Sequence, residues 1–137
     1  MRRLHSDISL DDLKAQNNYR ERIDLLQNRV ELLTGKDKLI MTMYLSNGNT
    51  YRQLAQLVGI NEANIARRIH KLTRKLIDGE YIKCIRNRAR FTKIEMDVAR
   101  DYFLAGLSFG AIADKRHDSY YNIRKTVLRI QRILSDK

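Results

Sequence analysis

Proline and tryptophan are absent from this 137-residue chain, and cysteine occurs once. The single cysteine, Cys84, excludes an internal disulfide and any zinc site built on several cysteines, and it fits a reducing compartment. Glycine is also scarce, whereas Leu, Ile, Ala, Arg and Lys dominate the composition. Because these residues favour helices, the composition predicts a chain that is helical throughout.

Signals for secretion and membrane insertion are missing as well. No stretch is long and apolar enough to span a membrane. Residues 1–9 contain Arg2 and Arg3 but no apolar run after them, so they do not resemble a secretory signal. We therefore expect a soluble protein of the cytoplasm, bacterial or phage-derived and associated with the nucleoid, without a membrane partner.

Features that carry enzyme chemistry are also lacking. The three histidines are scattered along the chain, which favours neither a metal site nor a histidine-based triad. The acidic residues Asp11, Asp12 and Asp114 have no convergent partners, and no glycine-rich loop suited to phosphates is present. The sequence therefore predicts no enzyme, no cofactor and no metal.

What the chain has in abundance is positive charge, with a formal net charge of +11. Phosphate backbones are the commonest reason for such a surplus, because basic side chains that neutralise phosphates release condensed counterions. Two alternatives are an anionic membrane surface, which would need a suitably amphipathic helix, and a basic surface kept for solubility. With 43% hydrophobic residues, the chain can still bury a core.

The most informative feature is an internal repeat. Thr34-x-x-Asp37 recurs as Thr92-x-x-Glu95, which lies 58 residues later (92 minus 34), and both resemble capping boxes. The same offset, without insertion, relates Tyr44 to Tyr102, Gly48 to Gly106, Thr50 to Ser108, Tyr51 to Phe109, Leu54 to Ile112, Ala55 to Ala113, Asn61 to Ser119, Asn64 to Asn122, Ile65 to Ile123, Ile69 to Val127, Leu72 to Ile130 and Leu76 to Leu134.

Each repeat predicts three helices. In the first repeat, the turn signals Asn47-Gly48-Asn49 and Gly59 separate them, and Thr50 and Asn61 act as caps. The predicted helices are 35–46, 51–58 and 62–77 in the first repeat, and 93–105, 109–115 and 120–135 in the second. The fold class is thus all-α, with two tandem three-helix helix-turn-helix units, assigned to domains 34–80 and 92–137.

Two segments lie outside the repeats. Residues 1–33 include a long helix from about Leu10, opened by Ser9-x-x-Asp12. Its apolar positions are spaced as in a short coiled-coil seam, so the helix either packs on the first repeat or forms a homodimer through residues 10–33. The seam consists of Tyr19, Ile23, Leu26, Val30 and Leu33. Residues 81–91 form either a basic linker or a small β-hairpin, a wing with Asn87-Arg88 at its tip.

A helix-turn-helix needs a small residue where its two helices approach and a left-handed turn between them. Ala55 and Gly59 meet these needs. Residues 50–61 (TYRQLAQLVGIN) and 65–70 (IARRIH) resemble region 4 of sigma-70-type sigma factors, most closely the extracytoplasmic-function branch. In that family, the last helix of region 4 enters the major groove of the −35 promoter element. Residues 108–134 look like a diverged copy.

The chain also departs from that family. No segment before residue 34 is long enough to be the aromatic-rich region 2 of a sigma factor, so the chain is not a complete sigma factor. The second repeat has Arg116-His117-Asp118 where the first has Val58-Gly59-Ile60. Its turn is therefore altered, and we expect the first repeat to carry most of the sequence reading.

In a docked helix-turn-helix, the N-terminal, outward-facing positions of the second helix reach base edges. The candidates for base contacts are Asn61, Glu62, Ala63, Ala66 and Arg67 in the first repeat and Ser119, Tyr120, Tyr121, Asn122, Arg124 and Lys125 in the second. Other basic residues would contact phosphates, which fix register without reading sequence. The phosphate candidates are Arg52, Arg68, Lys71, Arg74, Lys75, Arg129 and Arg132.

Three functions follow from these patterns. The first is a sequence-specific transcription regulator that binds double-stranded DNA. The second is a protein-interaction module, because the resemblance implies docking on RNA polymerase or on an anti-sigma-like partner. The third is a non-specific architectural DNA binder, for which the positive charge alone would suffice.

Overall fold

The computed structural model describes residues 10–136, with side chains from residue 17 onward, so the expected cap at Ser9 lies outside it. The described part of the chain is helical and contains no strand, as the composition predicts. None of its helices has the length and hydropathy that a membrane span requires. In chain order the elements are α1 (Leu10–Arg29), η2 (Val30–Leu32), α2 (Gly35–Ser46), α3 (Tyr51–Val58), α4 (Glu62–Asp78), α5 (Glu80–Arg86), η3 (Arg88–Arg90), α6 (Lys93–Ala99), η4 (Arg100–Leu104), α7 (Phe109–Arg116) and α8 (Tyr120–Ser135).

The six helices predicted from the two repeats are confirmed, and five of them match the observed bounds to within one residue. The exception is the predicted helix 93–105, which is α-helical to Ala99 and continues as the π-helical segment η4. Side-chain caps explain most of the starts. Thr50, Asn61, Thr92, Ser108 and Ser119 each accept a hydrogen bond from a backbone N–H group in the first turn of the following helix.

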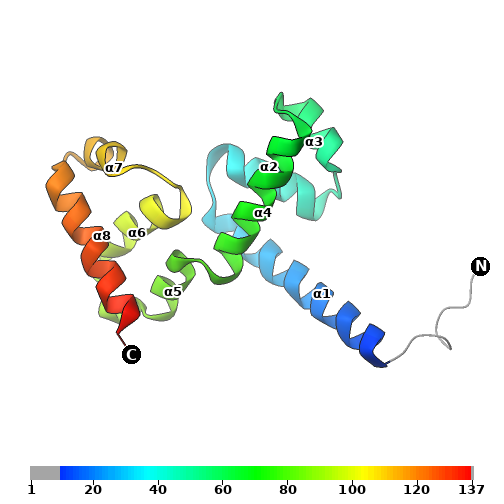
Figure 1. Cartoon of the computed structure of the whole chain (residues 1–137), viewed down its shortest axis with the longest axis horizontal. Coiled ribbons are helices and arrows are strands. Elements are labelled where there is room, and N and C mark those ends of the chain that lie inside the picture. The colour runs from blue at the N-terminus through cyan, green and yellow to red at the C-terminus, as the bar shows by residue number, and fades with distance from the viewer. Residues whose placement is uncertain (1–9, 137) are drawn as a thin grey trace, which may run out of the picture.

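The N-terminal helix α1 divides into two parts. Its C-terminal part and η2 pack on α2 and α4, and the seam residues Leu26, Val30 and Leu33 are buried. The helix also docks through Arg29, which donates hydrogen bonds to the backbone oxygens at the end of α4. Towards its N-terminus, α1 extends away from the rest of the molecule (Figure 1), and Tyr19 is 66% exposed. One half of the seam thus belongs to the core and the other half faces solvent.

The prediction of a linker or wing at residues 81–91 is wrong. These residues form α5 and the short 3-10 helix η3. The reason is the spacing of their apolar side chains, because Tyr81, Ile82 and Cys84 fall on one side of a helix and become buried. Lys83 and Arg86 remain on the accessible side, where they pair with Glu80 and Asp78. Contacts of α5 with α4, α6 and η4 make it a packed element of the fold.

The main hydrophobic core therefore crosses from one half of the chain to the other. It joins Leu54, Ile65 and Leu76 of the first half to Met96 and Ile130 of the second. A smaller core lies within the second half and consists of Val98, Ile112, Ala113, Ile123 and Val127. Most apolar positions that the 58-residue offset pairs are buried alike, as Leu54 and Ile112 illustrate, each with an exposed fraction of 0%. Leu76 and Leu134 differ, since Leu134 is half-buried.

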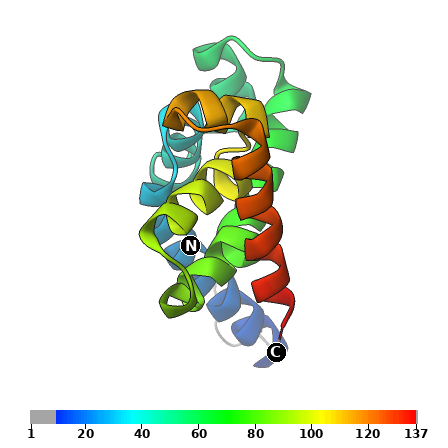
Figure 2. The same cartoon turned by 90° about the vertical axis from the view of Figure 1, so that its left-hand side faces the viewer.

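The two longest helices after α1, α4 and α8, stand on either side of this shared core. In Figure 1, each runs from its N-terminal end at the top of the view towards α5 near the bottom. Figure 2, turned by 90°, likewise shows their N-terminal ends towards the top, beside α3 and α7 respectively. The N-terminal turns of α4 and α8 therefore lie towards the same, upper side of the molecule, with that of α8 at the left of Figure 1 and that of α4 further to the right.

Candidate nucleic-acid interface

The turn between α3 and α4 has the geometry that the sequence predicts. Gly59 ends α3 with a φ of +71° and a ψ of 30°, which is the left-handed conformation. Its backbone N–H donates to the Ala55 oxygen at 3.0 Å, and the N–H of Ile60 donates to the same oxygen at 3.3 Å. This bonding closes the helix. The chain then passes directly into α4, capped by Asn61.

The turn between α7 and α8 follows the same path without a glycine. His117 has a φ of 56° and a ψ of 45°, and it is the one non-glycine residue with a positive φ among the residues that the structure describes. The N–H of Asp118 donates to the Ala113 oxygen at 2.9 Å, as Ile60 does to Ala55. Both turns are thus left-handed, although their sequences differ. In the second turn, His117 adopts this conformation at a cost that glycine avoids.

Stacked aromatic rings support both short helices. Tyr44 stacks on Tyr51 with ring centroids 5.6 Å apart, and Tyr102 stacks on Phe109 at 5.0 Å. Tyr44 and Tyr102, which the repeat offset pairs, are both half-buried. Hydrogen bonding with Tyr51 raises the pKa of the Tyr44 hydroxyl above its ordinary value of 10.0.

The two capping boxes predicted for the repeat starts differ. Thr92 and Glu95 form the reciprocal box as expected. Thr34 makes no side-chain capping bond, so the prediction of a Thr34–Asp37 box is wrong. The carboxylate of Asp37 instead accepts from Arg68 of α4 at 2.8 Å, because that stronger, charged donor is within reach. A box that the sequence analysis missed lies at Thr50, where Gln53 supplies the return bond.

The candidates for base contacts on α4 come together on one accessible surface. Glu62, Ala63 and Arg67 are exposed, and Ala66 is half-buried. Together with Tyr51, the first turn of α4 lines a shallow surface hollow. Asn61 is exposed but uses its side-chain oxygen to cap the helix. Arg67 donates to the side-chain oxygen of Asn64, which holds its guanidinium over the first turn.

The candidates on α8 are exposed to a similar degree. Tyr120 and Tyr121 are 57% and 65% exposed, although the Tyr120 ring also meets Phe109 edge to face at 5.6 Å. Arg124 and Lys125 are exposed as well. Ser119 caps the helix, and Asn122 donates to the carboxylate of Asp118 at 2.9 Å. That bond and the Ser119 N–H lower the pKa of Asp118, so a fixed negative charge stands at the turn.

The phosphate candidates separate into two groups. Arg52, Lys71, Arg74 and Arg132 are exposed, and their side chains have no protein partner among the side chains described from residue 17 onward. Three others bind within the chain. Arg68 pairs with Asp37, Lys75 donates to the Leu104 oxygen at 3.2 Å, and Arg129 pairs with the buried Glu95 at 2.6 Å. Burial lowers the pKa of Lys75, as expected for an amino group that points into the protein.

The sequence alone could not predict that Arg68, Lys75 and Arg129 bind within the chain. Each joins residues that lie about 30 positions apart in the chain, so no local pattern indicates them. Arg68, Lys75 and Arg129 therefore hold helices together in this fold, and the phosphate assignment is weakest for Lys75. Arg52, Lys71, Arg74 and Arg132 are the basic side chains that remain available to an anionic partner.

Comparison with protein-family models, with curated proteins and with solved structures finds no match to this chain. Among residues 10–136, no three His, Cys, Asp or Glu side chains converge as they would around a metal ion. The geometry of the two turns and of the helices that follow them is therefore the basis for assigning a function.

Proposed function

We propose that the protein is a sequence-specific DNA-binding transcription regulator, in which α3–α4 and α7–α8 are two helix-turn-helix units. One observation carries the proposal. In both halves, a short helix ends in the same left-handed turn and leads into a longer helix with an exposed, polar first turn. This is the arrangement in which a second helix can enter the major groove of DNA with its N-terminal side chains at base edges.

The placement of the two helices supports the proposal. The N-terminal turns of α4 and α8 lie towards the same, upper side of the molecule and are separated along its long axis (Figures 1 and 2). Both can therefore approach one duplex from one side. Glu62 and Arg67 would meet base edges in the first unit, while Arg124 and Lys125 would do so in the second.

The distribution of charge supports it further. α8 carries four basic residues and no acidic residue, and α4 carries five basic residues with its two acidic residues at the ends. Exposed Arg and Lys side chains beside the reading turns provide sequence-independent attraction to phosphates. The resemblance of residues 50–61 and 65–70 to region 4 of sigma factors points to the same mode of binding.

A second candidate function is docking on a protein such as RNA polymerase. Tyr121 and Leu128 are both exposed, and their spacing of seven residues places them on one face of α8. An exposed leucine in the middle of a helix suits a protein surface better than a phosphate backbone. This observation favours α8 rather than α4 as the protein-binding helix.

A mobility-shift titration preceded by selection from random duplexes tests the proposed function. We expect enrichment of a defined sequence and an affinity that falls steeply between low and high salt. Enrichment without any sequence preference would instead identify a non-specific architectural binder. Absence of binding at low salt would overturn the DNA assignment and leave protein docking as the candidate.

A further inference from the structure

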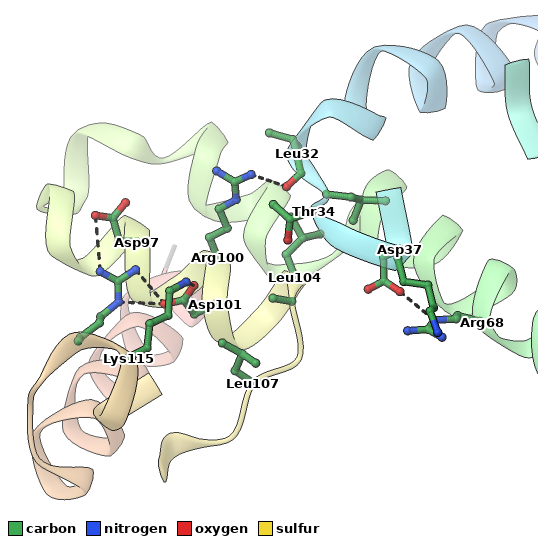
Figure 3. Close-up of a pocket in the computed structure, with 14 residues that line it drawn as sticks. Leu32, Thr34, Asp37, Arg68, Asp97, Arg100, Asp101, Leu104, Leu107 and Lys115 are labelled. Carbon is green, nitrogen blue, oxygen red and sulfur yellow. Dashed lines mark hydrogen bonds and ion pairs between the residues drawn. The ribbon is translucent and has the colours of Figure 1, made fainter. Parts of the chain in front are cut away.

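A cleft of about 550 Å³ lies between the two halves of the chain. One wall comes from η2 and the start of α2, together with Arg68 of α4, and the other comes from α6, η4 and α7 (Figure 3). Clefts that hold small molecules measure roughly 300 to 1,000 Å³, so this one has the size of a ligand site. It lies outside the turns to which DNA binding is assigned above.

The cleft has an apolar lining. It is formed by Leu32 and Leu33 on one side and by Leu104 and Leu107 on the other. Leu33 and Leu104 are buried, whereas Leu32 and Leu107 are half-buried and present part of their side chains to the cleft. An apolar lining with a few placed polar groups is typical of sites for small organic ligands.

The charges of the side chains that line the cleft do not sum to zero. Its three aspartates are already paired, Asp37 with Arg68, and Asp97 and Asp101 with Arg116. Lys115 also pairs with Asp101. Lys36 and Arg100 are the basic residues left over.

Both surplus cations can still bind a ligand. Lys36 is exposed and has no side-chain partner in the described part of the chain. Arg100 donates one N–H to the Leu32 oxygen at 2.7 Å, which leaves most of its five donors free (Figure 3). The cleft thus has a net positive charge, which lies beside its leucine side chains.

We propose that this cleft binds a small organic molecule with an acidic group and an apolar body. Arg100 and Lys36 hold the acidic group, and the apolar body lies against Leu32 and Leu107. Because the walls belong to different halves of the chain, the ligand bridges them and stabilises their mutual orientation. The site does not depend on DNA, so its test is separate from that of the proposed function.

The test uses 8-anilinonaphthalene-1-sulfonate, a fluorescent probe that combines a sulfonate with apolar rings. We expect saturable binding of one probe molecule to the full-length chain. Ala105→Trp places a large side chain in the cleft from an exposed position and should weaken binding by about tenfold or more, which corresponds to about 1.4 kcal/mol. Lys36→Glu should weaken it by about threefold to tenfold through loss of charge attraction.

Matched controls separate the cleft from the rest of the surface. Ala89→Trp and Lys93→Glu make the same changes at exposed positions outside the cleft, and each should leave the affinity within about twofold of the original. Probe-induced NMR shifts should be largest at the amides of Leu104 to Leu107. Equal binding by Ala105→Trp and Ala89→Trp, or shifts centred elsewhere, would overturn the proposal.

Discussion

Gly59 and His117 lie 58 residues apart and end corresponding helices in the same left-handed conformation, with φ of +71° and 56°. The backbone bonds that follow also correspond, since Ile60 donates to Ala55 and Asp118 to Ala113. The path of the turn is thus the same in both halves although the side chain differs. In the second half, a β-carbon occupies a conformation that L-residues adopt at a cost.

This relationship gives a prediction for stability. Gly59→Ala should lower the free energy of unfolding by about 1 kcal/mol, because the added β-carbon meets open space and the loss is backbone strain. His117→Gly should raise it by up to about 1 kcal/mol, since relief of strain is partly offset by the greater freedom of glycine in the unfolded chain. Urea denaturation measures both. Equal and negligible effects would show that the turns are not under this constraint.

For the first reading helix, we expect Arg67 and Lys71 to behave differently. Arg67→Ala should cost about 1–3 kcal/mol on a selected duplex and relax the sequence preference at one position. Lys71→Ala should weaken all duplexes alike and reduce the salt slope by about one. Titrations on selected and scrambled duplexes distinguish these results. A uniform loss in Arg67→Ala would place Arg67 on phosphates instead.

Lys75→Ala is the informative companion variant, because Lys75 binds the Leu104 oxygen within the chain. Its main effect should be a lower free energy of unfolding, with little change in the salt slope of DNA binding. The exposed Arg74 serves as the control, since Arg74→Ala should change the salt slope and leave stability nearly unchanged. The reverse result would restore Lys75 as a phosphate ligand.

The two reading helices should contribute unequally. Substitutions among Glu62–Arg67 should change which sequence is selected, because the exposed Glu62 and Arg67 offer an acceptor and a bidentate donor suited to base edges. Substitutions among Tyr120–Lys125 should mainly change how tightly any sequence binds. Selection from random duplexes with each set of variants is the measurement. If the α8 variants select a new sequence and the α4 variants do not, then the second unit and not the first determines the sequence preference.

The exposed part of α1 predicts a dimer. Tyr19 is 66% exposed, whereas Leu26, Val30 and Leu33 are buried in the core, so a second copy is the partner that we expect against the exposed end of the seam. The full chain should sediment as a dimer, and Tyr19→Glu as a monomer. Asn18→Glu, exposed on the neighbouring position, is the control and should remain dimeric. A monomer for the unmodified chain would remove the dimer from the proposal.

Cys84 predicts a pH dependence of stability. The thiol is buried, and burial raises its pKa to about 11 from an ordinary value of 9.0. Because the folded-state pKa is raised, the stabilisation is complete below pH 9 and is lost as the pH rises towards 11. Unfolding measured across this window should show a steeper decline for the original chain than for Cys84→Ala. Parallel declines would mean that other groups account for the loss.

Much of the fold could be predicted from the sequence, because its signals are local. Caps such as Thr50 and Asn61, the glycine at position 59 and the apolar spacing of α4 each act within a few residues. The segment 81–91 reads as exposed from sequence, because it carries four basic residues and no acidic one. Three buried side chains, Tyr81, Ile82 and Cys84, outweigh that charge once α4 and α6 cover them.

The candidate site was predictable to a lesser extent. Exposure of Glu62, Ala63 and Arg67 follows from the helical period, and it agrees with the structure. The partners of Arg68 and Arg129 could not be inferred, because Asp37 and Glu95 approach them only through the packing of distant helices. Basic residues on an amphipathic helix look alike in sequence whether they face solvent or a carboxylate.

The helix α5 has a consequence for how the two halves would act together. A flexible linker would let the second half search for its site once the first had bound, with an effective concentration set by linker length. α5 packs against both α4 and α6, so the separation of α4 and α8 in this structure is defined by packed helices and not by a flexible linker. On DNA, the chain would therefore fit two half-sites only at one fixed spacing. A target whose two half-sites are moved apart by a single base pair would lose the contribution of one half rather than stretch to meet it.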